Sequence, residues 1–488
     1  MRIQQHFRRK RCILHCYMSV YVAGSAWTGA LGLGHNAMIQ PDTSDVSDDD
    51  REDTFTELRY KNSLPDSIEV LDEILNVAAG WGHSAFIVTN QNTPRLLVCG
   101  RPYDFQTLLR LKRLPSFLRR PLIWTTLLFD EEKHATIRPL LTEIPLPMGD
   151  TPMNTTVGSN AGKVLAASAG TTAVVGQSGN LYMFGINQRG QCGINQPLTN
   201  HVWEPTSLVI SPSVKISYKP KFVSVALGLQ HGLAIDTEGS LFSWGKGNRG
   251  QLGVRKVMGP EQSPYPSGQF TDSTSSNWFS SLDLTSCEYA ALKVTEFHLT
   301  DSVHGKDTVI PASNIRVSKI SAGFNHSAAI TDSNHAWVWG KNTKLTSSTD
   351  TSIYSNMASD SQVPINIKGL PSNLLISDIS CGSHHTSILM EDGSVFAIGI
   401  ATDTLEPLVG PAVQIIPPGM IQLPVQQFTS HFDRTTVVGK EGSIMEVHLW
   451  EDANNGGVFE PGWVKGFHSQ KIKMVHRGWL HTIVVTEK

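Results

Sequence analysis

One pattern of apolar and polar positions recurs along the chain: an apolar run, Gly-x-x-His, a second run, a glycine turn and an aromatic-Gly pair. The clearest copy spans residues 223–253 and contains Ser243-Trp244-Gly245. In the second run apolar and polar positions alternate, and β-branched and aromatic residues are frequent, which predicts strands rather than helices. Glycines such as Gly239 supply the positive φ of a tight hairpin turn. The pattern therefore predicts a meander of short antiparallel strands.

Five copies keep both the glycine and the histidine of Gly-x-x-His. They are Gly80 with His83, Gly228 with His231, Gly323 with His326, Gly382 with His385, and Gly478 with His481. Two more copies occur at the expected place in the repeat but have another residue in place of the histidine: Gly170 with Ala173, and His431 with Arg434. Positions 385, 434 and 481 are 49 and 47 residues apart, so the repeat unit is about fifty residues and the longer spacings hold insertions.

The histidines recur once per repeat, which places them on separate spokes of a ring rather than in one metal cluster. We expect a structural role, in which a ring nitrogen satisfies backbone groups within or beside each blade.

The two chain ends carry complementary halves of the pattern. The N-terminus opens with a second half at Val20–Gly24, and the C-terminus closes with a first half over 475–486. A blade built from both ends removes the open strand edges of an unclosed array. We therefore predict an all-β fold, a seven-bladed β-propeller closed by N- and C-terminal strands that share one blade. Residues 1–18 form a basic leader or tail, and 19–488 form one domain with long insertions at about 35–73, 101–163 and 254–316.

These phrases resemble the regulator of chromosome condensation repeat family, above all Ser243-Trp244-Gly245 with Asn248–Gly253, and Asn187–Gly193. The resemblance covers about residues 19–488 and is weakest after Gly340 and over 429–450. It implies a seven-bladed propeller. Family members include an exchange factor for a small nuclear GTPase, exchange factors or assembly proteins in mitochondria, and interaction modules of larger proteins. The resemblance therefore leaves these functions open.

Composition narrows the class of protein. A net charge of -3 excludes a globally basic nucleic-acid binder, and 17% charged with 40% hydrophobic residues excludes a mostly disordered chain. The six cysteines are scattered without a Cys-x-x-Cys pair, so they form neither a disulfide framework nor a zinc motif. This usage predicts a reducing, intracellular compartment.

The first forty-one residues carry five basic side chains and no acid before Asp42. This stretch imitates a signal anchor, although His15, His35 and several glycines interrupt its uncharged part. It also fits a mitochondrial presequence, and Arg8 to Arg11 fits a nuclear import patch, while the remaining alternative is a solvated tail. We expect an intracellular protein and favour a mitochondrial location over a nuclear or cytoplasmic one.

Catalytic signatures are missing from the sequence. Gly245–Gly250 matches G-x-G-x-x-G, but it is followed by Gln-Leu-Gly and is a repeat turn. G-x-x-x-x-G-K-[ST], G-x-S-x-G and H-E-x-x-H do not occur. A calcium loop starting at Asp452 has Trp463 where a bidentate Glu is required. We assign no catalytic, cofactor-binding or metal-binding residue and expect neither an enzyme nor a small-molecule substrate.

The insertion that follows the first complete repeat is basic. Its six basic residues are Arg101, Arg110, Lys112, Arg113, Arg119 and Arg120. Leucines lie among them, so a basic amphipathic helix could contact RNA, a membrane surface or an acidic protein patch. The alternative is a solvated helix on the propeller rim.

These observations predict a protein-interaction propeller that acts on a protein partner. A guanine-nucleotide exchange factor for a small GTPase is the specific version of this function. The alternative is a non-catalytic scaffold for a ribonucleoprotein or another assembly complex. An enzyme with a pocket in the propeller channel is disfavoured because the signatures above are missing.

Overall fold

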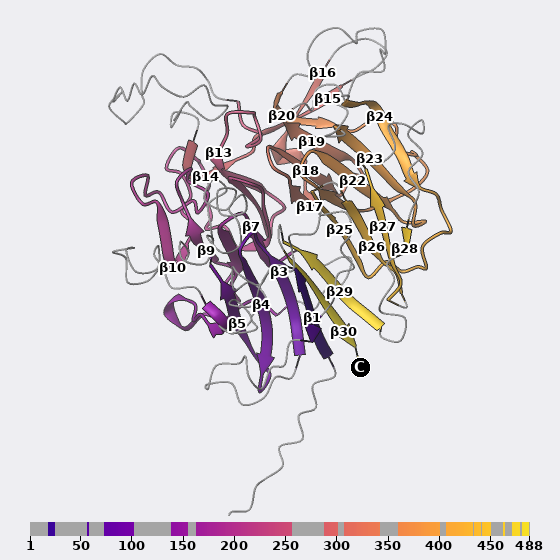
Figure 1. Cartoon of the computed structure of the whole chain (residues 1–488). Helices are drawn as coiled ribbons and strands as arrows, with labels where there is room; N and C mark the ends of the chain where they lie inside the picture. The colour runs from indigo at the N-terminus through magenta and orange to yellow at the C-terminus, as the bar shows by residue number, and fades with distance from the viewer. Residues whose placement is uncertain are drawn as a thin grey trace, which may run out of the picture.

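The computed structural model describes residues 18–24, 56–57, 73–101, 138–154, 163–255, 287–300, 307–341, 360–400, 407–432, 434–440, 442–449, 462–463, 471–478 and 481–487. These residues form seven sheets, antiparallel except for one parallel strand pair in the fourth blade, arranged as blades around a central axis (Figure 1). The only helical elements among them are two single 3-10 turns, Pro147–Gly149 and Ala312–Asn314. The predicted all-β, seven-bladed propeller is confirmed.

Six blades follow one another along the chain. Blade 1 contains β3 (Glu73–Ala79), β4 (His83–Asn90), β5 (Thr93–Gly100) and β6 (Arg138–Glu143). Blade 2 contains β7 (Leu165–Ser168), β8 (Thr171–Val175), β9 (Leu181–Ile186) and β10 (His201–Ser207). Blade 3 contains β11 (Phe222–Leu227), β12 (His231–Asp236), β13 (Leu241–Lys246) and β14 (Cys287–Lys293). Blade 4 contains β17 (Val317–Ala322), β18 (His326–Thr331), β19 (Ala336–Gly340) and β20 (Ser361–Asn366), extended by β15 (Glu296–Thr300) and β16 (Asp307–Pro311). Blade 5 contains β21 (Ile376–Cys381), β22 (His385–Met390), β23 (Val395–Ile400) and β24 (Pro407–Ile416). Blade 6 contains β25 (Gln427–His431), β26 (Arg434–Val438), β27 (Ile444–His448) and β28 (Gly462–Trp463).

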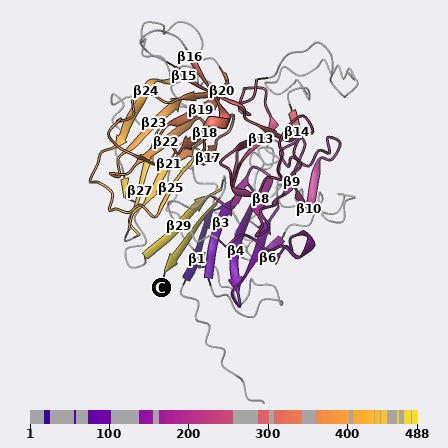
Figure 2. The same cartoon turned by 180° about the vertical axis from the view of Figure 1, so that it is seen from behind.

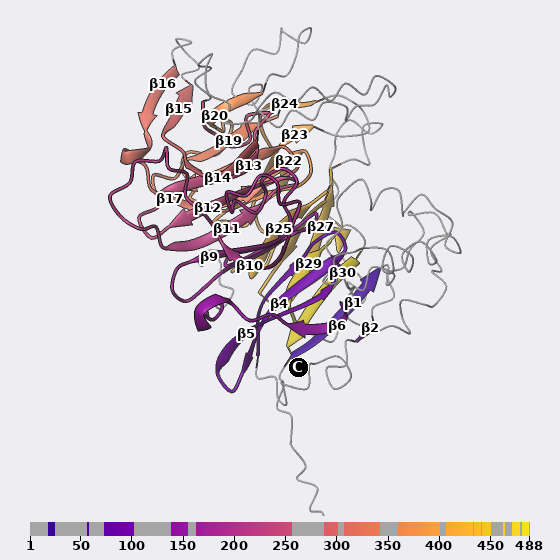
Figure 3. The same cartoon turned by 90° about the vertical axis from the view of Figure 1, so that its left-hand side faces the viewer.

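Blade 7 joins the two ends of the chain. Its sheet order is β2 (Thr56–Glu57), β1 (Met18–Gly24), β30 (His481–Glu487) and β29 (Lys471–Arg477). Along β1 and β30, Val20 lies opposite Val485 and Val22 opposite Ile483. Figure 2 shows β1 and β29 beside β3 of blade 1, and Figure 3 shows β1 with β30 and β2. The predicted closure, with each end supplying what the other lacks, is confirmed.

The blades pack face to face, so the inner strands are buried on both sides. Every residue of β18 is buried, although its sequence alternates. Ala328 and Ile330 pack with blade 5, whereas Ala329 packs with blade 3. The alternation therefore separates two inter-blade contacts rather than a core face from a solvent face.

The antiparallel order gives the propeller two distinct faces. Turns between the first and second strands, and between the third and fourth, leave from one end, which we call the insertion face. Turns between the second and third strands, and the links between blades, leave from the opposite face. Segments 102–137, 256–286 and 342–359 each lie between a third and a fourth strand, so they begin and end at the insertion face.

Candidate interaction face and central channel

The Gly-x-x-His motif has a steric cause. His83 pairs with Gly100 at the start of β4, and the Gly80 amide donates to the His83 carbonyl at 2.9 Å. The His83 ring folds back over Gly80, so that a Cβ at position 80 would lie 2.3 Å from a ring carbon. A Cβ added at any of the other four motif glycines would likewise lie within 2.4 Å of its histidine ring. Glycine is needed because the histidine occupies the space of a side chain.

The register of blade 2 corrects one sequence alignment. Thr171, not Ala173, lies opposite Gly185, as His231 lies opposite Gly245. The residue in the glycine position is therefore Ser168, and Gly170 belongs to the two-residue turn. The prediction for this copy was wrong by two residues, because a glycine within the turn was taken for the motif glycine. In blade 6 the assignment of Arg434 holds, since Arg434 pairs with His431 across the turn.

Each motif histidine bonds to the blade that follows it around the ring. The Nε2 contacts are His83 with Thr172 Oγ1 at 2.8 Å, His231 with Ser327 Oγ at 2.9 Å, His326 with Thr386 Oγ1 at 3.1 Å, His385 with Thr435 Oγ1 at 3.3 Å, and His481 with Ser84 Oγ at 2.8 Å. The expected partners were backbone groups, whereas the partner shared by all five rings is a hydroxyl. His326 also bonds to the His385 carbonyl at 3.2 Å. These hydroxyl partners could have been found in the sequence, because each is the Ser or Thr at the second residue of its strand. The strands are β4, β8, β18, β22 and β26.

These histidines are neutral in the folded protein. Burial lowers the pKa of His231 and of His385 to about 3, and that of His326 and of His481 to about 4. A protonated ring at these sites would place a charge between two packed sheets.

The junction of blades 2 and 3 lacks this bond for a visible reason. The histidine position holds Thr171, and the hydroxyl position of blade 3 holds Gly232. A Cβ at Gly232 would lie 2.3 Å from the ring of Trp244, which fills that space. The Trp244 indole donates to the Gln191 carbonyl at 2.8 Å and thereby connects the two blades. At the next junction, Trp339 donates to the Gln251 carbonyl at 2.9 Å.

The junction of blades 6 and 7 is held by ion pairs in place of the histidine–hydroxyl bond. Glu446 is buried and accepts from Arg477 at 2.5 Å and from Thr436 at 3.0 Å. Arg434, which replaces the motif histidine, lies 3.9 Å from the other Glu446 oxygen. Arg477 also donates to Thr482 at 3.4 Å, the hydroxyl that follows His481. An ion pair therefore replaces the histidine bond where the closing blade begins.

An aromatic cluster closes the central channel at the insertion face. The Trp81 ring lies 5.7 Å from Phe324 and 6.4 Å from Phe432, and Phe324 lies 5.6 Å from Phe432. These residues come from the first turns of blades 1, 4 and 6. Backbone bonds join neighbouring turns, among them Trp81 to the Ala169 carbonyl and Ser383 to the Phe432 carbonyl.

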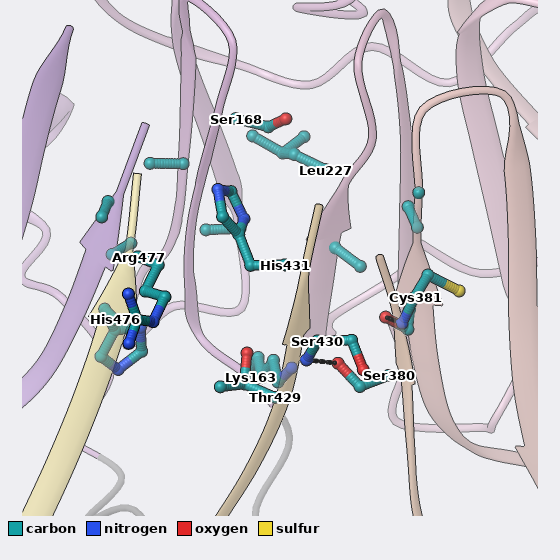
Figure 4. Close-up of a pocket in the computed structure, with 18 of the residues that line it drawn as sticks. Lys163, Ser168, Leu227, Ser380, Cys381, Thr429, Ser430, His431, His476 and Arg477 are labelled. Carbon is teal, nitrogen blue, oxygen red and sulfur yellow. Dashed lines mark hydrogen bonds between the residues drawn. The ribbon is translucent and has the colours of Figure 1, made fainter. Parts of the chain in front are cut away.

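Beneath the cluster lies a cavity of about 230 Å3, lined by the first strands of the blades (Figure 4). Polar groups occupy its other end. Lys319 lies 3.6 Å from Asp378 and donates to the Ser377 carbonyl at 2.6 Å. Gln427 bonds to the Val475 backbone, accepting at 2.6 Å and donating at 2.9 Å.

Of the six basic residues proposed as a partner contact, the structure describes Arg101. Its amide donates to the Gly82 carbonyl at 2.9 Å, which places it at the insertion face. Arg110, Lys112, Arg113, Arg119 and Arg120, with the expected amphipathic helix, lie outside the described residues.

Within the described residues we find neither a metal-binding cluster nor a reactive cysteine. No group of three metal-ligating side chains occurs within them. Burial raises the pKa of the Cys99 thiol to about 12 and that of Cys381 to about 11, so neither forms a reactive thiolate near neutral pH. The described residues also hold no helix with the length and apolar character needed to cross a bilayer.

Seven blades, five of which repeat one glycine-histidine turn, and a closing blade built from both chain ends define a repeat-built propeller. Models of the regulator of chromosome condensation (RCC1) repeat match residues 222–251 and 317–344, and residues 178–235 and 238–276. Over these residues the chain contains repeats similar to the RCC1 repeat.

Relatives and solved structures agree with this assignment. The ultraviolet-B receptor UVR8 of Arabidopsis thaliana is 25% identical over 252 residues, 49% of this chain and 53% of UVR8. The guanine nucleotide exchange factor SRM1 of Saccharomyces cerevisiae is 25% identical over 238 residues, 48% of this chain and 39% of SRM1. This chain thus matches about half or less of these relatives' length. The structure of Prp20p from S. cerevisiae aligns with a TM-score of 0.59 at 18% identity, covering 96% of this chain and 92% of Prp20p, which shows the shared fold.

Proposed function

We propose that this chain is a protein-interaction propeller without a catalytic centre and that its partner binds the insertion face. One observation carries the proposal: the basic segment and two further insertions begin and end at this face, where the aromatic cluster closes the channel. Loops held on a rigid scaffold are the usual carriers of recognition.

The specific version of this function is nucleotide exchange on a small GTPase. SRM1 is an exchange factor, and Prp20p has been characterised for binding to Gsp1p and histones, which supports a GTPase as the class of partner. Exchange requires no bond-making residue. A propeller that binds the nucleotide-free GTPase better than the loaded form shifts the GTPase toward nucleotide release.

The second candidate is a scaffold for a ribonucleoprotein or another assembly complex, favoured by the basic composition of residues 101–120. Contact with RNA or with a membrane surface through this segment stays a prediction. The two candidates differ in their dependence on nucleotide, since a scaffold binds its partner whatever nucleotide is present.

Affinity capture from native extract tests both candidates. The full chain is used as bait with excess guanine nucleotide and, in parallel, with a chelator that strips the nucleotide. Recovery of a small GTPase only from the stripped sample supports exchange. Equal recovery of partners from both samples, without a GTPase, supports the scaffold and contradicts exchange.

Charge reversal locates the contact. We expect R110E/K112E/R113E to abolish binding by a scaffold and to leave exchange largely intact. The matched control is K215E/K219E/K221E, three exposed lysines in the link between blades 2 and 3 on the opposite face. Equal loss in the two triple variants would show a nonspecific charge effect and contradict binding at the insertion face.

For location we propose a mitochondrial protein, on the basis of the basic, acid-free stretch before Asp42. Imaging of the tagged full chain and of a variant with Arg8 to Arg11 replaced by Gln tests this. Mitochondrial signal lost in the variant supports the proposal, whereas nuclear signal in the unchanged chain contradicts it.

A further inference from the structure

Three cations gather at the insertion face where blades 2 and 3 meet. Arg189 and Arg249 occupy the same position in the loops that follow β9 and β13, and Lys246 is the last residue of β13. Because β9 and β13 are third strands, these loops leave from the insertion face. Arg189 and Lys246 are partly exposed there. We call Arg189, Lys246 and Arg249 the cationic cluster.

Backbone contacts bring Arg189 next to Lys246. A Cβ at Gly190 would lie 2.8 Å from the Glu288 carbonyl oxygen, so the loop of blade 2 rests on the start of β14. In the register of β13 and β14, the preceding residue Cys287 lies opposite Lys246. Burial lowers the pKa of Lys246, and the charge of Arg189 lowers it further, which agrees with this proximity.

The two arginines are held by loops of one construction. The Gln191 side chain accepts from the Arg189 amide at 2.6 Å, and the Gln251 side chain accepts from the Arg249 amide at 2.9 Å. Both glutamines are buried, so each loop is fixed to the propeller at the base of its arginine. Groups that are positioned in advance lose less entropy when a partner binds.

Two described acids lie at the strand ends beside the cluster. Asp360 pairs with Arg249 at 3.3 Å. Glu288 lies opposite Gly245, so its side chain is on the other face of the β13–β14 pair from Lys246. Among the described residues, the two remaining cations of the cluster have no carboxylate within ion-pair distance. Neighbouring cations without paired acids attract an anionic partner.

An exposed leucine accompanies the cluster. Leu198, on the same loop as Arg189, is 93% exposed. The Asn187 side chain donates to the carbonyls of Gln196 at 3.2 Å and of Thr199 at 3.0 Å, which ties the segment around Leu198 to the end of β9. A protein segment in which acids flank an apolar residue matches both features. The phosphates of a nucleic acid would satisfy the cations and leave the leucine uncovered.

We propose that the cationic cluster binds an acidic segment of the protein partner, whose carboxylates contact Arg189 and Lys246 and whose neighbouring apolar side chain covers Leu198. This inference rests on the proposed function, because it names the chemistry that the partner presents to the insertion face. The charges steer the segment to the face, and the leucine selects an acidic segment that also has an apolar residue.

Three labelled peptides test the proposal by fluorescence anisotropy with the full chain at low ionic strength. The leucine peptide has two glutamates on either side of one leucine, the serine peptide replaces that leucine by serine, and the glutamine peptide replaces each glutamate by glutamine. We expect the leucine peptide to bind about fivefold more tightly than the serine peptide and to dissociate as salt is added. Equal binding of the leucine and glutamine peptides overturns the proposal.

A nucleic acid is the competing occupant. A single-stranded oligoribonucleotide with the same net charge as the leucine peptide serves as its probe. We expect it to bind more weakly than the peptide, because it has no apolar contact with Leu198. Tighter binding by the oligoribonucleotide, with displacement of the peptide, would assign the cluster to nucleic acid and overturn the proposal.

Variants assign the residues. R189E/K246E should weaken binding of the leucine peptide about tenfold or more, because it reverses both charges that contact the acids. The matched control K215E/K219E reverses two exposed lysines of the opposite face and should leave the affinity unchanged. Leu198→Ser should remove the preference for the leucine peptide over the serine peptide. Unchanged binding by R189E/K246E overturns the proposal.

Asp360→Asn gives a result that misfolding cannot produce. It releases Arg249 from its ion pair, so the leucine peptide should bind about twofold to threefold more tightly, and weaker binding contradicts the proposal. Affinity capture separates this inference from the proposed function. A partner captured equally by the unchanged chain and by R189E/K246E contradicts the role of the cluster and leaves the proposed function standing. Capture of no partner contradicts the proposed function, while the peptides still decide what the cluster binds.

Discussion

The ring of His83 and the hydroxyl of Thr172 are 2.8 Å apart, although 89 positions separate these residues along the chain. Apart from blade 7, which joins the two chain ends, hydrogen bonds within a blade mostly join strands that follow one another along the chain. The bond between His83 and Thr172 joins two blades, and equivalent bonds recur at four other junctions. Because both partners are buried, the loss of either one leaves a polar group without solvent to replace it.

The His231–Ser327 pair allows a direct measurement of one such bond. We expect His231→Ala to lower the free energy of unfolding by about 2–3 kcal/mol, since it creates a cavity and removes the bond. With Ser327→Ala, the double-mutant cycle should give a coupling energy of about 0.5–1.5 kcal/mol. Urea denaturation measures both values.

His335 provides the matched control for that cycle, because it is an exposed histidine of the same propeller. His335→Ala should change the free energy of unfolding by no more than about 0.5 kcal/mol. A zero coupling energy between His231 and Ser327 would show that the bond contributes nothing to stability.

The buried histidines make stability depend on pH. Burial holds the pKa of His231 and His385 near 3, and that of His326 and His481 near 4, below the ordinary value of 6.5 in the unfolded chain. The unfolded state therefore binds more protons below pH 6.5. The stabilisation is fully present above pH 6.5 and is lost as pH falls toward 4.

Each such histidine should remove roughly 1.4 kcal/mol per pH unit in that window. Denaturant unfolding at intervals from about pH 7.5 to 4.5 should give a plateau followed by a steep decline. His231→Ala should reduce the slope by about one proton. A stability that stays constant down to about pH 5 would show that the histidine pKa values are not depressed.

The repeat phrase predicted the strands, the seven blades and the shared closing blade, because each depends on local pattern and on the two chain ends. The hydroxyl partners of the histidines were missed, since Thr172 follows a residue that is not histidine and its role appears only when blades 1 and 2 meet. The cavity residues were also missed. His431 is visible in the sequence as a broken glycine position. Lys319 and Asp378, in contrast, meet at the cavity only because blades 4 and 5 pack side by side.

Gly80 tests the steric account of the repeat motif. The three atoms nearest to an added Cβ all belong to the His83 ring, the closest at 2.3 Å. We expect Gly80→Ala to destabilise the fold by about 1–3 kcal/mol, since the ring must leave its rotamer and its bond to Thr172. Thermal or urea unfolding measures the change.

The double variant G80A/H83A separates this clash from a backbone effect. With the ring removed, adding the Cβ at position 80 should have an effect below about 0.5 kcal/mol relative to His83→Ala alone. Equal destabilisation by Gly80→Ala in both backgrounds would contradict the clash.

The closing blade gives the last prediction. Val20 and Val22 of β1 are 0% and 1% exposed, and they lie opposite Val485 and Ile483 of β30. A chain that begins at Ser25 loses β1 and leaves β30 with an open edge. Burial of the two valines alone stabilises the fold by about 3 kcal/mol or more, and the unpaired edge favours association with other chains.

For the chain that begins at Ser25 we expect a lower free energy of unfolding in urea and higher-order species in size-exclusion chromatography. The control chain begins at Tyr17, keeps β1 and should match the full chain. A peptide of residues 17–24 added to the shorter chain should restore stability by pairing with β30. Full stability of the chain that begins at Ser25, without the peptide, would show that the N-terminal strand is not needed to close the ring.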